Sequence, residues 1–301
     1  MEPSIPLTHS NHPAFLYQDM LADQFRMQCY RRAINQLVQP GDIVADLGTG
    51  MGVLAMMAIQ AGAAHVYAVE NRPQVVAITK EIIARNDMAE RITLIEGDAR
   101  EITIDAEVDL IINELIGDFG TDENIVECVD EFTRKHLKPG GRCLPQKLRT
   151  YLVPVEYSEE YRGIWRKDFQ GLDLSYVAQL SCREEAEMLI LARQPKELAI
   201  PQLIENIDFT SKIPVRANSI DCQFTLHSEG RLQGFMGFFQ ADLSPDIRLD
   251  NYPVYPGCHW QTWHWPLYPP PKSKPGFIVK CKLTTTKNMI AQGWQLNWAM
   301  Q

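Results

Sequence analysis

The chain has 301 residues, of which 45% are hydrophobic and 22% are charged, and its formal net charge at pH 7 is −9. This composition predicts a globular protein with one large or two modest cores. The negative charge argues against a nucleic-acid binder, which needs a basic face for phosphates.

Targeting and redox signals are weak. The N-terminus lacks the basic and apolar regions of a signal peptide, and the most apolar stretch, 53–69, is too short and too interrupted to span a membrane. Seven cysteines are scattered without a C-x-x-C pair, and no zinc spacing is evident. We therefore expect a cytoplasmic protein without a disulfide framework, a metal site or a membrane partner.

The first half of the chain alternates between helical and strand patterns. Residues 16–38 have apolar side chains at helical spacing, and Pro40-Gly41 ends that pattern. Short runs rich in Val and Ile then alternate with helical segments; the runs are 43–47, 65–69, 92–97 and 108–113, and the helices lie near 51–62, 73–86 and 121–136. This alternation predicts an N-terminal helical segment at 1–40 and a doubly wound, mostly parallel, Rossmann-like α/β domain at 41–145.

The second half, 146–301, is rich in strand patterns separated by Gly and Pro turns. The predicted strands are 149–157, 219–227, 232–243, 258–268, 276–286 and 293–298. Such short strands predict an antiparallel, β-barrel-like domain. Residues 158–205 are more charged and read as a helical insertion.

A glycine-rich loop follows the first predicted strand. In VADLGTGMGVLA (44–55) the glycines are spaced G-x-G-x-G, whereas a dinucleotide fingerprint would need glycine in place of Val53. Glu70 and Asp98 end the next two strands, where carboxylates can bind a ribose and an adenine amino group. Asp46, just before the glycines, suits a ligand that carries an ammonium and a sulfonium. Together these residues predict an S-adenosylmethionine site.

Acidic residues cluster after the fourth predicted strand. Residues 101–131 contain eleven Asp or Glu and no Lys or Arg, and part of this charge is explained by the solvated face of a helix. Glu114, directly after the buried strand, is not explained in that way. At an effective dielectric near 20, two carboxylates about 6 Å apart repel by roughly 3 kcal/mol, whereas a cation about 4 Å from each gains roughly 4 kcal/mol per contact. Glu114 and Glu123 therefore predict a guanidinium clamp.

Four stretches resemble the protein arginine N-methyltransferase family. NELIGDFGTDE (113–123) resembles its double-E loop, and MLADQFRMQCYRRAI (20–34) resembles its helix over the cofactor. LDLS (172–175) resembles the segment near its dimerisation arm, and CHWQTW (258–263) resembles its Thr-His-Trp loop, with Cys258 in place of threonine. The tyrosine-rich helix that precedes Met20 in the family is reduced here to one tyrosine, Tyr17.

The resemblance implies a fold, a reaction and a set of site residues. It implies S-adenosylmethionine as cofactor, S-adenosylhomocysteine as product, an arginine-containing protein or peptide as substrate, and a homodimer formed through 158–205. Arg26 would hold the carboxylate of the cofactor, and Asp23 would pair with His259. The predicted catalytic residues are Glu114, Glu123, His259 and Asp23. The predicted cofactor contacts are Arg26, Asp46, Gly48, Thr49, Gly50, Glu70, Asp98, Ala99 and Glu114, and the predicted substrate contacts are Glu114, Glu123, Met20 and Trp260.

Two other functions fit the same residues. One is an N-methyltransferase of a small guanidino or amine compound or of a natural-product peptide. The other is a non-catalytic protein that binds S-adenosylmethionine and docks a basic partner on its acidic surface. Without the family resemblance, His259 and Trp260 would be read as a strand histidine and a core tryptophan.

Overall fold

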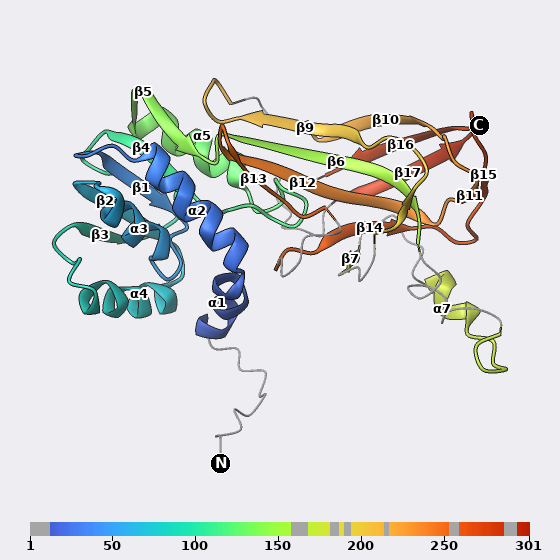
Figure 1. The fold of residues 1–301 in the computed structure, drawn as a ribbon, viewed down its shortest axis with the longest axis horizontal. Helices are drawn as coiled ribbons and strands as arrows, with labels where there is room; N and C mark the ends of the chain where they lie inside the picture. Colours follow the sequence, from blue (N-terminus) through green and yellow to red (C-terminus); the bar gives the residue numbers. More distant parts are fainter. Residues whose placement is uncertain are drawn as a thin grey trace, which may run out of the picture.

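The computed structural model describes residues 13–157, 168–180, 187–189, 194–213, 217–252, 259–285 and 294–301. The parallel sheet of the first half and the antiparallel sheets of the second half lie side by side, and the N-terminal helices lie near their junction (Figure 1). None of the described helices is long and apolar enough to cross a membrane.

Two helices form where a single helical pattern over 16–38 was expected. They are α1 (Pro13–Ala22) and α2 (Gln24–Leu37). The break falls at Asp23, whose carboxylate accepts a hydrogen bond from the Arg26 backbone N–H at 3.0 Å and so caps α2. The buried face of α2 includes Tyr30 and Ile34. The cap fixes the start of α2, and with it the position of Arg26.

The predicted parallel sheet is present, with strand order β3-β2-β1-β4-β5. Its strands are β1 (Ile43–Leu47), β2 (His65–Glu70), β3 (Ile92–Glu96), β4 (Val108–Asn113) and β5 (Leu137–Leu144). The helices α3 (Val53–Ala61), α4 (Pro73–Arg85) and α5 (Ile125–His136) pack on these strands. β1 and β4 are almost entirely buried, as expected for central parallel strands that are covered on both faces.

β5 was not predicted. Its residues include the Lys138-Pro-Gly-Gly141 run, which the sequence marks as a turn before the second half. The strand nevertheless pairs in parallel with β4, Ile111 lying opposite Cys143. The register shifts between Val108 and Leu110, so the breaker residues are accommodated by an irregularity at the outer edge of the sheet.

The second half is an antiparallel, curled sheet domain, as predicted. A seven-stranded sheet contains the path β7-β14-β12-β6-β8, with β13 paired to β12 and β9 paired to β6, and a three-stranded sheet has the order β10-β16-β17. The strands are β6 (Lys147–Glu156), β7 (Glu187–Leu189), β8 (Lys196–Glu197), β9 (Gln202–Asp208), β10 (Ser219–Thr225), β11 (Gly230–Arg231), β12 (Gly234–Ser244), β13 (Ile247–Asp250), β14 (Thr262–Pro266), β15 (Lys272–Ser273), β16 (Ile278–Thr284) and β17 (Gln295–Met300).

The insertion at 158–205 is less helical than expected where it is described. Its described helix is α7 (Ser175–Leu180), which lies away from both sheets (Figure 1). β7, β8 and the start of β9 fall within the same range and pair with β14 and β6. Among the described charged residues of this range, Lys196 and Glu197 form β8 and Glu205 lies in β9.

One hydrophobic core crosses the boundary between the two halves. It contains strand residues of the parallel sheet together with Leu148 of β6, Phe239 of β12, Leu249 of β13 and Trp260. α2 packs against both β12 and β13. The segment that carries His259 and Trp260 is therefore held against the parallel-sheet half.

Candidate active site

The predicted site residues gather at the carboxyl edge of the parallel sheet. The chain passes from β1 outward to β2 and β3 and then returns to β4 on the other side of β1. Leu47, the last residue of β1, pairs with Val69 on one side and Asn113 on the other. This reversal of strand order leaves a crevice between the loops after β1 and β4, where open α/β sheets bind ligands.

A cavity of about 640 Å³ fills this crevice. Ten of the predicted residues line it: Met20, Arg26, Gly48, Thr49, Gly50, Glu70, Asp98, Ala99, Glu114 and Glu123. The other four predicted residues, Asp23, Asp46, His259 and Trp260, lie behind these and are not among the described lining residues. The cavity is large enough for a nucleoside-sized ligand.

The glycine loop forms one wall of the cavity. Gly48 and Gly50 have φ of 71° and 54°, a region that side chains other than glycine rarely adopt. A Cβ on Gly48 would lie 2.6 Å from Leu115 Cδ2, and one on Gly50 would lie 2.5 Å from Tyr17 Cε1. Glycine is required here because the loop is covered closely on its cavity side.

Asp46 supports the loop from beneath. Its Oδ2 accepts a hydrogen bond from the Thr49 hydroxyl at 2.6 Å, and burial raises the pKa of this carboxyl to about 7. Its Oδ1 is buried and has no hydrogen-bond partner among the described residues. A buried oxygen of this kind costs free energy unless a donor reaches it.

Glu70 and Asp98 are each paired with an arginine two residues later, which the sequence reading missed. Glu70 Oε2 accepts from the Gly50 N–H at 3.1 Å, and its Oε1 accepts from the backbone N–H and Nε of Arg72 at 3.0 and 3.1 Å. Arg100 forms an ion pair with Asp98 and keeps the pKa of that carboxyl below its usual range. The acid-x-Arg spacing, which recurs after two neighbouring strands, is the sequence signal that could have revealed these ion pairs.

Tyr17 covers the glycine loop from α1. Its ring lies against Gly50, its hydroxyl accepts a hydrogen bond from Arg72 Nη2, and the Arg72 guanidinium lies 5.2 Å from the ring centroid. Burial, with the negative charge of Glu70 as the next cause, raises the pKa of this phenol to about 12. The single tyrosine ahead of Met20 thus forms part of the cavity wall.

Glu114 and Glu123 face the same cavity. Burial raises the pKa of Glu114 to about 7, although Arg26, whose Nη2 lies 3.3 Å from Glu114 Oε2, opposes this shift. Burial, followed by the charge of Glu114, raises the pKa of Glu123 to about 7. Glu114 Oε1 and Arg26 Nε have no hydrogen-bond partners among the described residues. The charge of Glu114 therefore acts on Glu123, and one oxygen of Glu114 is left without a hydrogen-bond partner among the described residues.

The other two acids of the loop have structural partners. Asp118 Oδ1 accepts a hydrogen bond from the Gln261 N–H at 2.6 Å. Asp122 Oδ1 accepts one from the Phe119 N–H at 3.0 Å, inside the loop itself. The crowding of carboxylates thus has two causes, because Asp118 and Asp122 hold backbone while Glu114 and Glu123 face the cavity.

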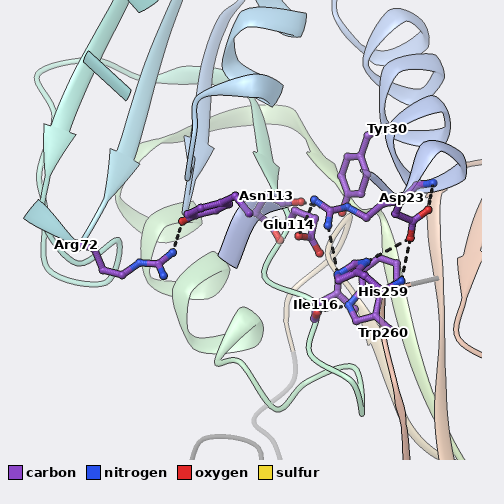
Figure 2. Close-up of polar contacts among 10 residues, drawn as sticks. Asp23, Tyr30, Arg72, Asn113, Glu114, Ile116, His259 and Trp260 are labelled. Carbon is purple, nitrogen blue, oxygen red and sulfur yellow. Dashed lines mark hydrogen bonds and ion pairs between the residues drawn. The ribbon is translucent and has the colours of Figure 1, made fainter. Parts of the chain in front are cut away.

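Asp23 and His259 form the expected pair between the two halves of the chain. Asp23 Oδ2 lies 3.3 Å from His259 Nδ1, and His259 Nε2 lies 3.3 Å from Arg26 Nη1. Figure 2 shows Glu114 between Arg72 on one side and the Asp23–His259 pair on the other. A neutral imidazole that carries its proton on Nδ1 satisfies both contacts, since it donates to Asp23 and accepts from Arg26.

The protonation of His259 limits its chemistry. Burial, with Arg26 as the next cause, lowers the pKa of His259 to about 4. Its free lone pair already faces Arg26. A neutral and occupied imidazole of low basicity is a poor proton acceptor at pH 7, so its position favours orienting Arg26 over receiving a proton.

Trp260 is not among the described residues that line the cavity, and its predicted role as a substrate contact stays a prediction. Its indole Nε1 donates to the Ile116 carbonyl at 2.8 Å, and its ring packs edge-to-face on Phe239. It is 7% exposed and belongs to the shared core. It therefore supports the acidic loop from the core side, which agrees with the core-tryptophan alternative.

Sequence comparison finds similarity to methyltransferases. The family model of ribosomal protein L11 methyltransferase (PrmA) matches residues 28–144. The probable protein arginine N-methyltransferase 6 of Arabidopsis thaliana is 29% identical over 245 residues, which cover 78% of this chain and 56% of that protein. Protein arginine N-methyltransferase 1 of Dictyostelium discoideum is 36% identical over 175 residues, covering 56% and 51%. The chain thus spans little more than half the length of these curated relatives.

Solved structures share the fold. The Trypanosoma brucei PRMT1 enzyme–prozyme heterotetrameric complex with AdoHcy matches with a TM-score of 0.75 at 23% identity, over 95% of this chain and 96% of that chain. Arabidopsis thaliana protein arginine methyltransferase 10, in an open conformation, matches with a TM-score of 0.76 at 21% identity, over 95% and 97%. The same succession of a parallel sheet and a curled antiparallel sheet is found in each. The chain is a homologue of the protein arginine N-methyltransferases, a family of class I S-adenosylmethionine-dependent methyltransferases, as its motifs indicate.

Proposed function

We propose that this protein transfers a methyl group from S-adenosylmethionine to a guanidino nitrogen of an arginine-like substrate and leaves S-adenosylhomocysteine. The observation that carries the proposal is the pair of carboxylates, the buried side chain of Glu114 and the more exposed Glu123, in one cavity with the glycine loop. Desolvation raises both pKa values to about 7, and the charge of Glu114 adds to the shift of Glu123, so two charged carboxylates are held here at a cost that Arg26 offsets only in part. A guanidinium relieves that cost.

The residues of the cavity fit the cofactor. The unpartnered Asp46 Oδ1 lies behind the loop, and the unpartnered Arg26 Nε belongs to the guanidinium assigned to the cofactor carboxylate. We assign Glu70 to the ribose, and Asp98 with Ala99 to the adenine. The bound cofactor supplies an electrophilic methyl group on a sulfonium. Tyr17, over the loop, restricts access of water to that region.

The protein contributes charge placement and alignment. Glu114 and Glu123 bind the guanidinium through the nitrogens they face and draw its positive charge toward those nitrogens. The remaining nitrogen then keeps a usable lone pair for in-line attack. Asp23 and His259 hold Arg26, which in turn contacts Glu114. Met20, on the cavity wall, is proposed to limit the substrate's position.

Changing Asp23 to Asn tests the Asp23–His259–Arg26 contacts. The amide oxygen can still cap α2, but its NH₂ group would face the Nδ1–H of His259. Either two donors oppose each other, or the imidazole changes tautomer and presents Nε2–H to Arg26. We expect turnover to fall about 10- to 100-fold through misalignment, with an unchanged melting temperature. Turnover equal to that of the unmodified protein would contradict the assigned role.

A substrate panel tests the reaction. Transfer of a radiolabelled methyl group is measured with arginine-rich histone-like peptides, free arginine, small guanidines and primary amines. The proposal expects labelling of guanidines and none of amines, with mass spectrometry placing the methyl on the guanidino group. Labelling confined to amines would refute it. Binding of S-adenosylmethionine without transfer to any acceptor would favour the non-catalytic alternative.

We also infer a cytoplasmic homodimer. In the insertion, Leu172 and Tyr176 are 62% and 68% exposed beside the LDLS segment, and exposed apolar side chains of this kind suit a partner surface. The five cysteines that the structure describes, among them Cys222 and Cys281, are free thiols, which fits a reducing compartment. Sedimentation at micromolar concentration that gave monomers alone would remove the inferred dimer.

A further inference from the structure

Asn251 is a buried amide that joins three separate segments. It follows β13 and is 3% exposed. Its Oδ1 accepts from the backbone N–H of Phe239 in β12 at 2.7 Å, and its Nδ2 donates to the carbonyls of Asp118 and Gln261, each at 2.7 Å. The opposite amide orientation would place NH₂ against an N–H and oxygen against two carbonyls, so a single orientation satisfies all three contacts.

The contacts of Asn251 close a ring with Asp118 and Gln261. Asp118 receives the Asn251 amide at its backbone carbonyl, and its carboxylate accepts the N–H of Gln261 at 2.6 Å. Gln261 is therefore held at its N–H by Asp118 and at its C=O by Asn251. Mutually supporting hydrogen bonds in a buried site fix geometry more firmly than isolated ones.

This ring lies between the two proposed catalytic elements. On one side, Asp118 lies within the loop that separates Glu114 from Glu123. On the other side, Gln261 is two residues from His259, which contacts Asp23 and Arg26. Trp260, between them, donates to Ile116 of the same loop. The acidic loop and the histidine segment thus share one anchor.

We propose that Asn251 is a positioning residue for methyl transfer, which sets the spacing of Glu114 and Glu123 and the place of His259 through its hold on Asp118 and Gln261. It contacts neither the cavity nor the residues assigned to the cofactor. This role rests on the proposed function, because it assigns Asn251 to the same site. A structural amide would act on stability alone, whereas a positioning residue acts on the acceptor step and spares cofactor binding.

Asn251→Asp is the informative variant. The side chain keeps its shape and its acceptor for Phe239, but an oxygen replaces the NH₂ that faces two carbonyls. We expect kcat/KM for the acceptor to fall about 10- to 100-fold, and the Kd of S-adenosylmethionine by calorimetry to change less than about threefold. Asn86→Asp is the matched control, since Asn86 donates to the Ile82 carbonyl at an exposed site. It should match the unmodified protein in both measurements.

A double-mutant cycle separates positioning from general damage. Asp118→Ala and Asn251→Ala each release one side of Gln261, so the double variant should lose about as much kcat/KM as the worse single variant. Losses that multiply would overturn the proposal. So would acceptor kcat/KM of Asn251→Asp equal to that of the unmodified protein, or parallel losses of acceptor turnover and cofactor affinity.

Amide hydrogen exchange tests the anchor without any activity. In Asn251→Asp, and in the milder Asn251→Ser if the first variant is unstable, exchange should rise in peptides covering 114–123 and 259–262 and stay unchanged over 43–70. Unchanged exchange in the first two peptides would overturn the anchoring role. Failure of the unmodified protein to methylate any acceptor would refute the proposed function instead, and exchange alone would then decide the anchor.

Discussion

Glu114→Gln is expected to reduce methyl transfer about 10²- to 10³-fold, as removal of one group that stabilises developing charge does in other enzymes, and to leave cofactor affinity within about threefold. The amide keeps the shape of the side chain but cannot balance a guanidinium. It also cannot form the ion pair that Arg26 makes with Glu114 at 3.3 Å. Single-turnover transfer with saturating S-adenosylmethionine measures the loss, and calorimetry measures cofactor affinity.

The control for this variant is Glu107→Gln, at an exposed position just before β4 and outside the described residues that line the cavity. It removes the same charge from the same acidic stretch, so long-range electrostatics change equally in both variants. Turnover near that of the unmodified protein is expected. Equal losses in the two variants, or full turnover in Glu114→Gln, would contradict the assignment of Glu114 as half of a guanidinium clamp.

The acceptor kcat/KM should rise with pH through about 7 and level off above about pH 8. Burial raises the pKa of both Glu114 and Glu123 to about 7, so each carboxyl gains its charge in this range. The guanidinium, with a pKa above about 12, stays protonated throughout. If both carboxylates must be charged, kcat/KM should fall about 100-fold per pH unit on the acid side. Rates on a guanidino peptide between pH 5.5 and 9 measure this profile.

Glu123→Gln checks that these two carboxyls cause the fall of kcat/KM at acid pH. With one titrating carboxyl left, kcat/KM should fall less steeply, about tenfold per pH unit. The same substitution should lower activity but raise thermal stability at alkaline pH. A carboxyl whose folded pKa is raised stabilises the fold fully below its ordinary pKa of 4.5, and that stabilisation is lost as the pH rises from there through about 7. The variant should therefore melt higher than the unmodified protein at pH 8 and not at pH 4.5. A profile flat from pH 5.5 to 9 would contradict the clamp.

Sequence patterns predicted the parallel sheet well because its strands are buried on both faces. The expected bounds of β1 and β4 agree with the structure residue for residue, since continuous apolar runs end in Asp, Asn or Gly at the loops. β5 was missed because Pro139 and its two glycines oppose strand propensity, and pairing with β4 overrides that preference. The break at Asp23 was missed because apolar spacing continues across it while a capping hydrogen bond ends one helix and starts the next.

The sequence predicts the place of those site residues that directly follow strands. It does not predict the place of residues that are positioned by long-range contacts. The glycine loop, Glu70, Asp98 and Glu114 follow the carboxyl ends of strands, so strand assignment places them together. The contact of Arg72 with Tyr17, across 55 residues, has no sequence period that would reveal it. For Trp260 the motif predicts a substrate contact, whereas its burial in the shared core became visible only in the structure.

The two halves of the chain, which meet near residue 145, share one hydrophobic core, and this makes a hinge motion between them unfavourable. Phe239 and Trp260, which pack edge-to-face, share this core with strands of the parallel sheet, and separating the halves would expose large aromatic surfaces to water. Rigid-body opening is therefore a costly route for an incoming acceptor. An acceptor must therefore reach the cavity, which Tyr17 of α1 lines, while the two halves stay packed together.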